Sequence, residues 1–441
     1  MASSPADSAD LVVDRAPAWR MLAALAAAEL LGMSLWFSAT AVTASLVGAF
    51  QLSTLQTSWL TTAVQGGFVV GTFLTAVLNV ADVVPARRLM GLGAIAGALA
   101  NAAALAVASP AALIATRLLT GVSLAWVYPP AMKIVAGWFR QRRGLALGAI
   151  VGALTLGKAM PHLVTALFGG EWRTSLLFTS GLALAGAAIA LGVVRDGPLT
   201  VTTARFDLGA IRRIAAVRDV RLVTLGYLGH MWELYAMWAW VAVFAAASLA
   251  ASGVSSPARL AAVVAFVAIG SGAAGCVLAG RLADAIGKAT VARASMAVSA
   301  GCAVLTVLAY GRHPAWLFAL VIVWGFAVVA DSAQFSALVS ERAPADAVGT
   351  ALTLQTSLGF LLTMVTIDLT PRIAGLAGWR WGCAFLALGP VAGHVAMGRL
   401  AAAPGGRPVR PPRGRSSGID SVTRARPDPQ RTGIRESCPC A

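Results

Sequence analysis

The sequence predicts an all-α polytopic membrane protein, in which twelve transmembrane helices form two parallel six-helix repeats. Three observations lead to this fold class: the composition, the number of long apolar segments, and a pattern that recurs in the second half of the chain. Hydrophobic residues make up 58% of the 441 residues and charged residues only 12%, with a mean hydropathy of +0.77. Soluble domains carry about a quarter charged residues, so this composition indicates that lipid surrounds most of the chain.

The apolar segments account for the predicted helices one by one. A helix needs roughly 20 mostly apolar residues to cross the hydrocarbon while satisfying its own backbone hydrogen bonds. Twelve segments meet this requirement: 18–42, 56–80, 89–108, 112–135, 144–168, 174–194, 221–248, 258–280, 289–310, 314–339, 349–369 and 379–400. They divide the chain into an N-terminal segment (1–17), an N-terminal bundle (18–194), a central linker (195–220), a C-terminal bundle (221–400) and a tail (401–441). The tail is rich in Arg, Pro, Gly and Ser, a composition that predicts disorder.

Basic residues alternate between the predicted loops. With the N-terminus placed inside, seventeen arginines and lysines fall in cytoplasmic segments and only five in the opposite loops. This positive-inside bias predicts an even number of spans, both termini in the cytoplasm, and a multi-pass protein of the cell (inner) membrane. The net charge of +16 therefore does not indicate a nucleic-acid partner, because the basic residues follow alternate loops rather than one face.

The sequence lacks the motifs that would indicate several other classes of protein. The N-terminus has three aspartates and no basic region of the kind that opens a signal peptide. The five cysteines are scattered, which predicts neither disulfides nor a metal site. No G-x-x-x-x-G-K-[ST] loop for ATP and no His-rich, Ser–Lys or metal-spaced constellation is present. We therefore expect neither an enzyme nor a cofactor, and a monomer whose partners are a small solute and the bilayer.

The second half of the chain repeats short motifs of the first. "ELLGMSLW" (29–36) and "ELYAMWAW" (233–240) share the pattern E-L-x-x-M-x-x-W, and "ADVVPARR" is followed at a similar distance by "ADAIGKAT". "RRGLAL" (142–147) matches "AVGTAL" (347–352), and "WRTSLLF" (172–178) matches "WRWGCAF" (379–385). Four matches in one order at nearly one spacing indicate a duplicated six-helix unit.

The motifs resemble those of the major facilitator superfamily over nearly the whole chain except the tail. "GRLADAIGK" (280–288) is similar to that family's loop signature between the eighth and ninth helices, and "LNVADVVPARR" is a degenerate first-half copy. "RLLTG" (117–121) resembles the R-x-x-x-G pattern of the fourth helix. The resemblance implies alternating access of two bundles, closed on the cytoplasmic side by a gate. The expected gate residues are Asp82, Arg87, Arg88, Gly280, Asp284, Gly287 and Lys288; the alternative is that they only cap loops.

The subfamily stays open. The antiporter signature of the fifth helix ends in Gly-Pro, and here Ala153 stands at the proline position. There is a distant similarity to nitrate/nitrite porters and organic-solute permeases. Their anion-binding arginines on the second and eighth helices are not matched, because the second span offers Gln65 and the eighth has Arg259 only at its mouth.

Charged side chains near the bilayer midplane are the candidate substrate and proton-coupling residues. Such charges cost roughly 2.5–3.5 kcal/mol each, so each one suggests a function. The resemblance places Glu29 and Glu233 opposite each other across a central cavity, with further groups on the remaining lining helices. The full candidate set is Glu29, Arg117, Lys158, His230, Glu233, Tyr235, Asp331 and Gln334. Fixed structural ion pairs, such as Glu29 with Arg117 or Lys158, are the alternative.

The sequence thus predicts a secondary active transporter of a small solute, with protons as the expected coupling ion. Lys158 and Arg117 favour an organic or inorganic anion, whereas Glu29, Glu233 and Asp331 are compatible with a cation or drug. The alternatives left open are multidrug or metabolite efflux by proton antiport and, in another class, a membrane-embedded enzyme or a sensor that no longer transports.

Overall fold

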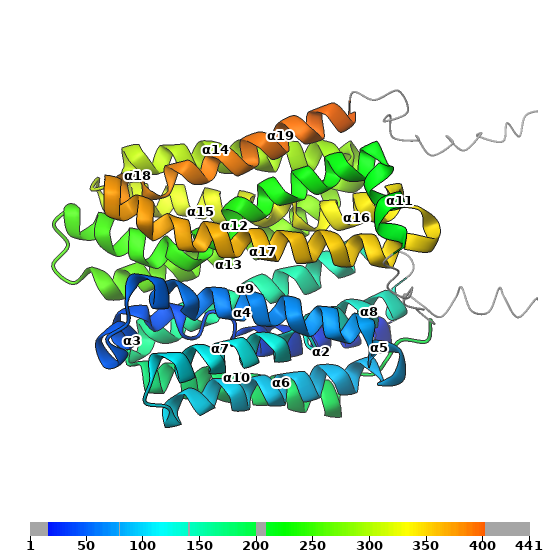
Figure 1. The fold of residues 1–441 in the computed structure, drawn as a ribbon, viewed down its shortest axis with the longest axis horizontal. Helices are drawn as coiled ribbons and strands as arrows, with labels where there is room; N and C mark the ends of the chain where they lie inside the picture. The colour runs from blue at the N-terminus through cyan, green and yellow to red at the C-terminus, as the bar shows by residue number, and fades with distance from the viewer. Residues whose placement is uncertain (1–15, 79, 140–141, 200–208, 402–441) are drawn as a thin grey trace, which may run out of the picture. The chain divides into compact units, whose positions relative to one another are not determined.

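The computed structural model describes residues 16–78, 80–139, 142–199 and 209–401, with the side chains of Ala81, Asp82 and Arg143 also left out. These residues form helices and connecting turns, and none of the described residues forms a strand (Figure 1). The helices of the first half are α2 (Ala16–Met33), α3 (Thr43–Phe50), α4 (Thr54–Val77), α5 (Val80–Val83), α6 (Ala86–Ala103), α7 (Pro110–Leu124), α8 (Tyr128–Trp138), α9 (Arg143–Phe168) and α10 (Trp172–Gly192). Those that follow are α11 (Ala210–Ala216), α12 (Arg218–Ala251), α13 (Pro257–Ile286), α14 (Lys288–Ala309), α15 (Pro314–Ala330), α16 (Ser332–Arg342), α17 (Val348–Ala377), α18 (Trp379–Gly382) and α19 (Leu388–Ala401).

Eleven segments of the described chain are long and apolar enough to span a membrane. They coincide with the second to twelfth predicted spans and differ mainly at their ends. The first predicted span, 18–42, corresponds to α2, which has 18 residues and includes Arg20 and Glu29. The helix ends at Met33, earlier than expected, and the chain continues through turns and η1 (Thr40–Val42) into α3. The predicted fold class is confirmed. The predicted disordered tail lies outside the described residues.

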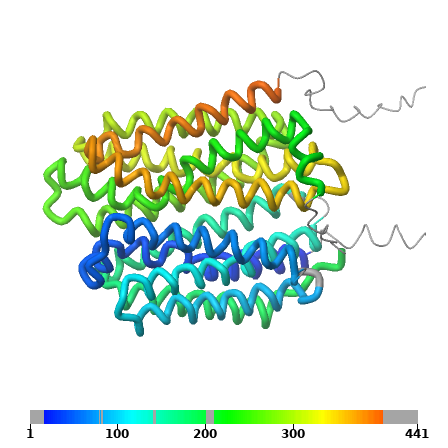
Figure 2. Tube along the Cα trace, in the orientation of Figure 1, coloured from blue at the N-terminus to red at the C-terminus, as the bar shows by residue number. Residues whose placement is uncertain are grey.

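Each half packs mainly within itself. In the first half α4 lies against α7 and α6 against α10; in the second, α12 lies against α19 and α17, and α14 against α15. The tube in Figure 2 follows the two halves from blue to green and from green to orange. The halves meet mainly along two helix pairs, α9 with α13 and α4 with α17.

Small residues bring α9 and α13 close together. A Cβ added at Gly152 would lie 3.2 Å from the carbonyl oxygen of Ala273, and one at Gly148 would lie 3.4 Å from that of Cys276. Glycine at these positions therefore lets two backbones approach where larger side chains would hold them apart. This seam places Lys158, further along α9, beside the second half.

Two helix interruptions occupy equivalent positions in the two halves. The fourth span is broken between α7 and α8 at residues 125–127, directly before Tyr128-Pro129-Pro130, because proline cannot donate to the helical ladder. The tenth span is broken between α15 and α16 at Asp331. Broken helices expose backbone and side-chain polar groups inside a bundle, which is tolerated where protein or a cavity surrounds them.

Candidate functional site

Lys158 lies between the two halves and is buried by both. Its Nζ donates a hydrogen bond to Oη of Tyr235 on α12 at 2.5 Å. The same Nζ lies 3.9 Å from the ring centroid of Trp36, 4.7 Å from that of Tyr235 and 5.5 Å from that of Trp238. A desolvated ammonium over aromatic faces is stabilised by the ring quadrupoles. One cation from α9 is thus held by an aromatic cage to which both halves contribute.

More aromatic rings extend the cage toward α4 and α17. Trp36 lies 5.1 Å from Phe68 and 5.8 Å from Phe360, and Phe68 and Phe360 are 4.8 Å apart, all measured between ring centroids. Tyr235 lies 5.2 Å from Phe360. The rings are tilted toward one another, the arrangement that aromatic quadrupoles favour. At the interface between the halves, aromatic side chains therefore surround the ammonium of Lys158.

Several buried polar groups lack a hydrogen-bond partner among the described residues. Both carboxylate oxygens of Glu29 and the indole N–H groups of Trp36 and Trp238 belong to this set. So do the side-chain amides of Gln65 and, at its nitrogen, Gln355. α2 and α9 pack closely beside Glu29 and Lys158, since a Cβ built on Gly157 would meet the carbonyl oxygen of Leu30. Buried polar groups are nearly always paired in proteins, and two of these unpaired groups, Trp36 and Trp238, lie around Lys158.

Glu233 is held within the second half. Its Oε2 accepts a hydrogen bond from Oγ of Ser299 on α14, and its Oε1 accepts one from the indole N–H of Trp324 on α15, each at 2.7 Å. The side chain is 1% exposed. Glu29 and Glu233 occupy equivalent sequence positions, yet only Glu233 has both oxygens satisfied.

His230 and Asp331 form a second buried pair in the same half. Nδ1 of His230 lies 2.8 Å from Oδ1 of Asp331, and both side chains are buried. Asp331 reaches this position because it stands at the break between α15 and α16. Gln334 follows on α16 and is also buried, and Phe335 packs against the ring of His230. The C-terminal bundle thus encloses two carboxylates and one imidazole.

The two faces of α12 contact different halves of the protein. Successive helical residues are separated by about 100°, so Glu233 and Tyr235 project on opposite faces. Tyr235 meets Lys158 of the other half, whereas Glu233 meets Ser299 and Trp324 of its own. Glu233 is therefore engaged inside its own bundle rather than across the interface toward Glu29.

Arg117 lies inside the first half and binds backbone carbonyls. Its Nη1 donates to Oδ1 of Asn101 at 2.5 Å, and its Nη2 donates to the carbonyl oxygens of Leu35 and Trp36 at 2.9 and 3.4 Å. These carbonyls are available because α2 ends at Met33 and the chain turns there. Arg117 therefore fixes the turn that presents Trp36 to Lys158. No carboxylate among the described residues forms an ion pair with it.

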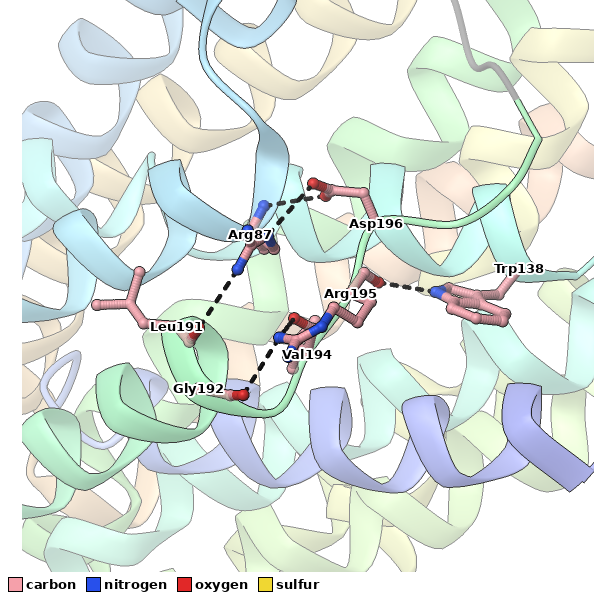
Figure 3. Close-up of polar contacts among 7 residues, drawn as sticks. All are labelled: Arg87, Trp138, Leu191, Gly192, Val194, Arg195 and Asp196. Carbon is pink, nitrogen blue, oxygen red and sulfur yellow. Dashed lines mark hydrogen bonds and ion pairs between the residues drawn. The ribbon is translucent and has the colours of Figure 1, made fainter.

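Of the expected gate residues of the first half, Arg87 contacts the start of the central linker (Figure 3). The backbone N–H of Arg87 donates to Oδ1 of Asp196 at 3.1 Å, and its Nε lies 3.9 Å from Oδ2. Its Nη1 donates to the carbonyl oxygen of Leu191 at 3.3 Å. Arg88 is exposed, and the side chain of Asp82 lies outside the described residues. Arg87 thus joins α6 to the segment that follows α10.

The gate residues of the second half lie where α13 ends. Gly287 has φ +90°, a conformation that favours glycine, and it separates α13 from α14. Nζ of Lys288 pairs with Oε1 of Glu341 at 2.7 Å. A Cβ built on Gly144, near the start of α9, would lie 3.8 Å from Oδ2 of Asp284, so this carboxylate reaches across to the first half. Gly280 lies along the same edge, with a built Cβ 3.6 Å from the carbonyl oxygen of Gly144.

The site contains residues that the sequence did not single out. Trp36 belongs to the repeated E-L-x-x-M-x-x-W motif, which was a usable signal. Ser299 and Trp324 carried none, because serines and tryptophans are common in membrane helices. Among the described residues there is no cluster of three or more His, Cys, Asp or Glu side chains that could hold a metal ion.

Comparisons with known proteins agree with this architecture. The family model described as "Major Facilitator Superfamily" matches residues 24–367. Among solved structures, a nucleoside transporter, NupG, superposes with a TM-score of 0.65 at 15% identity, covering 86% of this chain and 99% of its own. A bacterial homolog of the human lysosomal transporter Spinster, in an inward-facing, unoccupied conformation, has a TM-score of 0.62 at 16% identity, covering 88% and 96%. At such identities these structures show the fold alone. No curated protein sequence matches the chain.

Proposed function

Because the chain belongs to the major facilitator superfamily and is a multi-pass membrane transporter of a small solute, we propose that it moves an organic anion by alternating access of its halves, driven by protons. The observation that carries the proposal is the buried contact between Lys158 of one half and Tyr235 of the other. A cation held at the interface of two moving bundles is accessible to solute when either side opens.

The groups around Lys158 favour an organic anion. The unpartnered indole N–H groups of Trp36 and Trp238 are donors, as is the ammonium, so together they suit a carboxylate or a similar acceptor. The neighbouring rings of Phe68 and Phe360 suit an apolar or planar body. A solute anion would thus replace the aromatic cage and Tyr235 as the partner of Lys158.

Buried acidic residues in both halves are the proposed proton carriers. Glu29 has no hydrogen-bond partner among the described residues and lies near Lys158, so a proton on it would free the ammonium for substrate. In the second half, Glu233, Asp331 and His230 are all buried, and His230 lies against Asp331. A net charge is costly at such buried positions, so the uptake of a proton changes the relative free energies of the inward-open and outward-open conformations.

The ends of the α9–α13 pair are the proposed gates. At the linker end, Asp284 lies beside Gly144; at the opposite end, Nε of Arg259 donates to the carbonyl oxygen of Ala166 at 3.1 Å. Opening on one side requires that one of these contacts separate while the other holds. With the linker end placed in the cytoplasm by the charge bias, Asp284 belongs to the inner gate of a monomer in the cell (inner) membrane.

The second candidate is proton antiport of a cationic drug or metabolite. The observation that favours it is the aromatic cage itself, because such cages also bind organic ammonium ions. In that case Lys158 would occupy the cage in the absence of substrate, and a cation would displace it toward Glu29.

The test is a thermal-shift screen of organic anions and cations on purified wild-type protein and on Lys158→Met. Hits are then assayed in proteoliposomes with and without an imposed pH gradient. An anion that stabilises only the wild type and accumulates with the gradient supports the proposal. Stabilisation of both proteins by a cation favours antiport, and transport that ignores the gradient contradicts proton coupling.

A further inference from the structure

A groove runs along the membrane-facing side of the second half, between α14 and α15. Its volume is about 630 Å³, within the roughly 300–1,000 Å³ of pockets that hold small organic ligands. The groove is separate from the Lys158 site, and none of its lining residues contributes to the contacts described above. Its walls are almost entirely apolar, with Leu305, Leu308, Leu320 and Val323 along the two helices.

One charged group closes the groove at the end away from the linker. Arg312 lies in the connection between α14 and α15, and Trp316 lies beside it at the start of α15. Both side chains are exposed. Among the described residues, the guanidinium of Arg312 has no hydrogen bond and no ion pair. Arginine and tryptophan at the end of a membrane helix mark the depth of the lipid headgroups.

The charge pattern matches one kind of membrane component. An apolar groove that descends from an unpaired cation at headgroup depth is complementary to a phosphate joined to a hydrocarbon chain. From Ala309 to Cys302 the groove follows α14 for about 10 Å at 1.5 Å per residue, so it accepts the upper part of an acyl chain. We propose that this groove binds one anionic phospholipid, with its phosphate on Arg312 and an acyl chain between α14 and α15.

The position of the groove connects this lipid to the buried carboxylate. Cys302, in the lining, lies one helical turn from Ser299, and Val323 immediately precedes Trp324. Ser299 and Trp324 are the two donors that hold Glu233. A chain between α14 and α15 therefore sets the spacing of the two helices on which Glu233 depends. Any effect of the lipid on transport rests on the proposed function, whereas binding does not.

The test measures bound phosphatidylglycerol directly. The full-length protein is reconstituted with phosphatidylglycerol and phosphatidylcholine, extracted, and examined by native mass spectrometry. We expect the wild type to retain one more phosphatidylglycerol than Arg312→Gln, which lacks the charge, or Leu308→Trp, which fills the groove. Arg372→Gln is the matched control, since this exposed arginine at the same end is paired with Asp368 at 2.9 Å and lies outside the groove. Equal retention in all four proteins would overturn the proposal.

A second measurement needs no variant. Phosphatidylglycerol with a photoreactive group in its acyl chain is cross-linked to the wild type, and the modified peptides are mapped. We expect labelling of α14 and α15 that excess unlabelled phosphatidylglycerol suppresses severalfold and phosphatidylcholine does not. Suppression by both lipids alike would mean that the groove holds any chain or an apolar solute, and it would refute a headgroup-specific site.

Discussion

Replacing Lys158 with methionine separates the functional from the structural account of the buried cation. In the structure Lys158 has one hydrogen bond to Tyr235 and lies over the ring of Trp36. A hydrogen bond from a charged donor contributes about 1.5–3 kcal/mol, and a desolvated cation–π contact about 2 kcal/mol. Burial of the ammonium opposes these gains with a penalty of several kcal/mol. The terms nearly cancel, so we expect Lys158→Met to change stability by no more than about 1–2 kcal/mol.

Arg117→Met should destabilise the protein more than Lys158→Met does. Arg117 donates to Asn101 and to two backbone carbonyls of the turn after α2, so its removal loses three hydrogen bonds from one charged donor. Each hydrogen bond from a charged donor contributes about 1.5–3 kcal/mol, and Arg117 makes three of them where Lys158 makes one. The apparent Tm of purified Arg117→Met should therefore fall well below that of Lys158→Met, which should stay near the wild type.

The assay combines the Tm with solute counterflow in proteoliposomes. Lys158→Met should be folded yet fail to exchange substrate, because the group that recognises the anion is gone. Tyr235→Phe, which keeps the ring and removes only the hydroxyl, should retain part of the activity. Full exchange by Lys158→Met would refute the role of Lys158 in recognition, and a Tm as low as that of Arg117→Met would assign it to structure.

Three further predictions concern other parts of the molecule. Glu233→Gln should keep expression, with its amide oxygen accepting from the indole of Trp324 and its amide nitrogen donating to Oγ of Ser299, but it should abolish pH-driven accumulation in proteoliposomes. Undiminished accumulation would leave Glu233 a structural residue. Asp284→Asn should slow turnover more than it weakens solute binding, and an unchanged rate would argue against the gate. At Asp346, the hydrogen bond from Arg213 lowers the carboxyl pKa from its ordinary value of 3.8, outweighing a small opposing effect of desolvation. A carboxyl whose pKa is lower in the folded than in the unfolded state stabilises the fold above the unfolded pKa, and this stabilisation is lost as the pH falls through the folded pKa. The wild type should therefore have a slightly higher free energy of unfolding than Asp346→Asn near neutral pH, and this difference should disappear below about pH 3.8. An advantage that persists in more acidic solution, or that is insensitive to salt at neutral pH, would contradict this ion pair.

The candidate site was only partly accessible to sequence reasoning. Buried charges stand out in an apolar chain, so Lys158, Glu233 and Asp331 could be found from the sequence. Their partners could not, because a partner depends on how each helix is rotated about its axis. Tyr235 and Glu233 are two residues apart, and only packing decides that one meets the other half and the other meets Ser299.

The places where the helices are interrupted could not be predicted from the sequence either. The first predicted span, 18–42, assumed an uninterrupted helix, but α2 ends at Met33. The carbonyls freed by that ending bind Arg117, which sequence reasoning could only group with the substrate residues. Composition does not reveal where a helix breaks unless a proline marks the place, as Pro129 and Pro130 do for α8.

The sequence by itself determined the membrane class, the second to twelfth spans, the duplicated half and the superfamily, because each depends on local composition or on motifs that repeat along the chain. The tertiary structure alone decided that Lys158 lies in an aromatic cage built by both halves, that Arg117 holds a turn, and that Glu233 and Glu29 differ despite equivalent positions. The physical reason is that burial and pairing are properties of surfaces brought together by packing. A duplicated sequence can therefore carry the same carboxylate twice and give it two different environments.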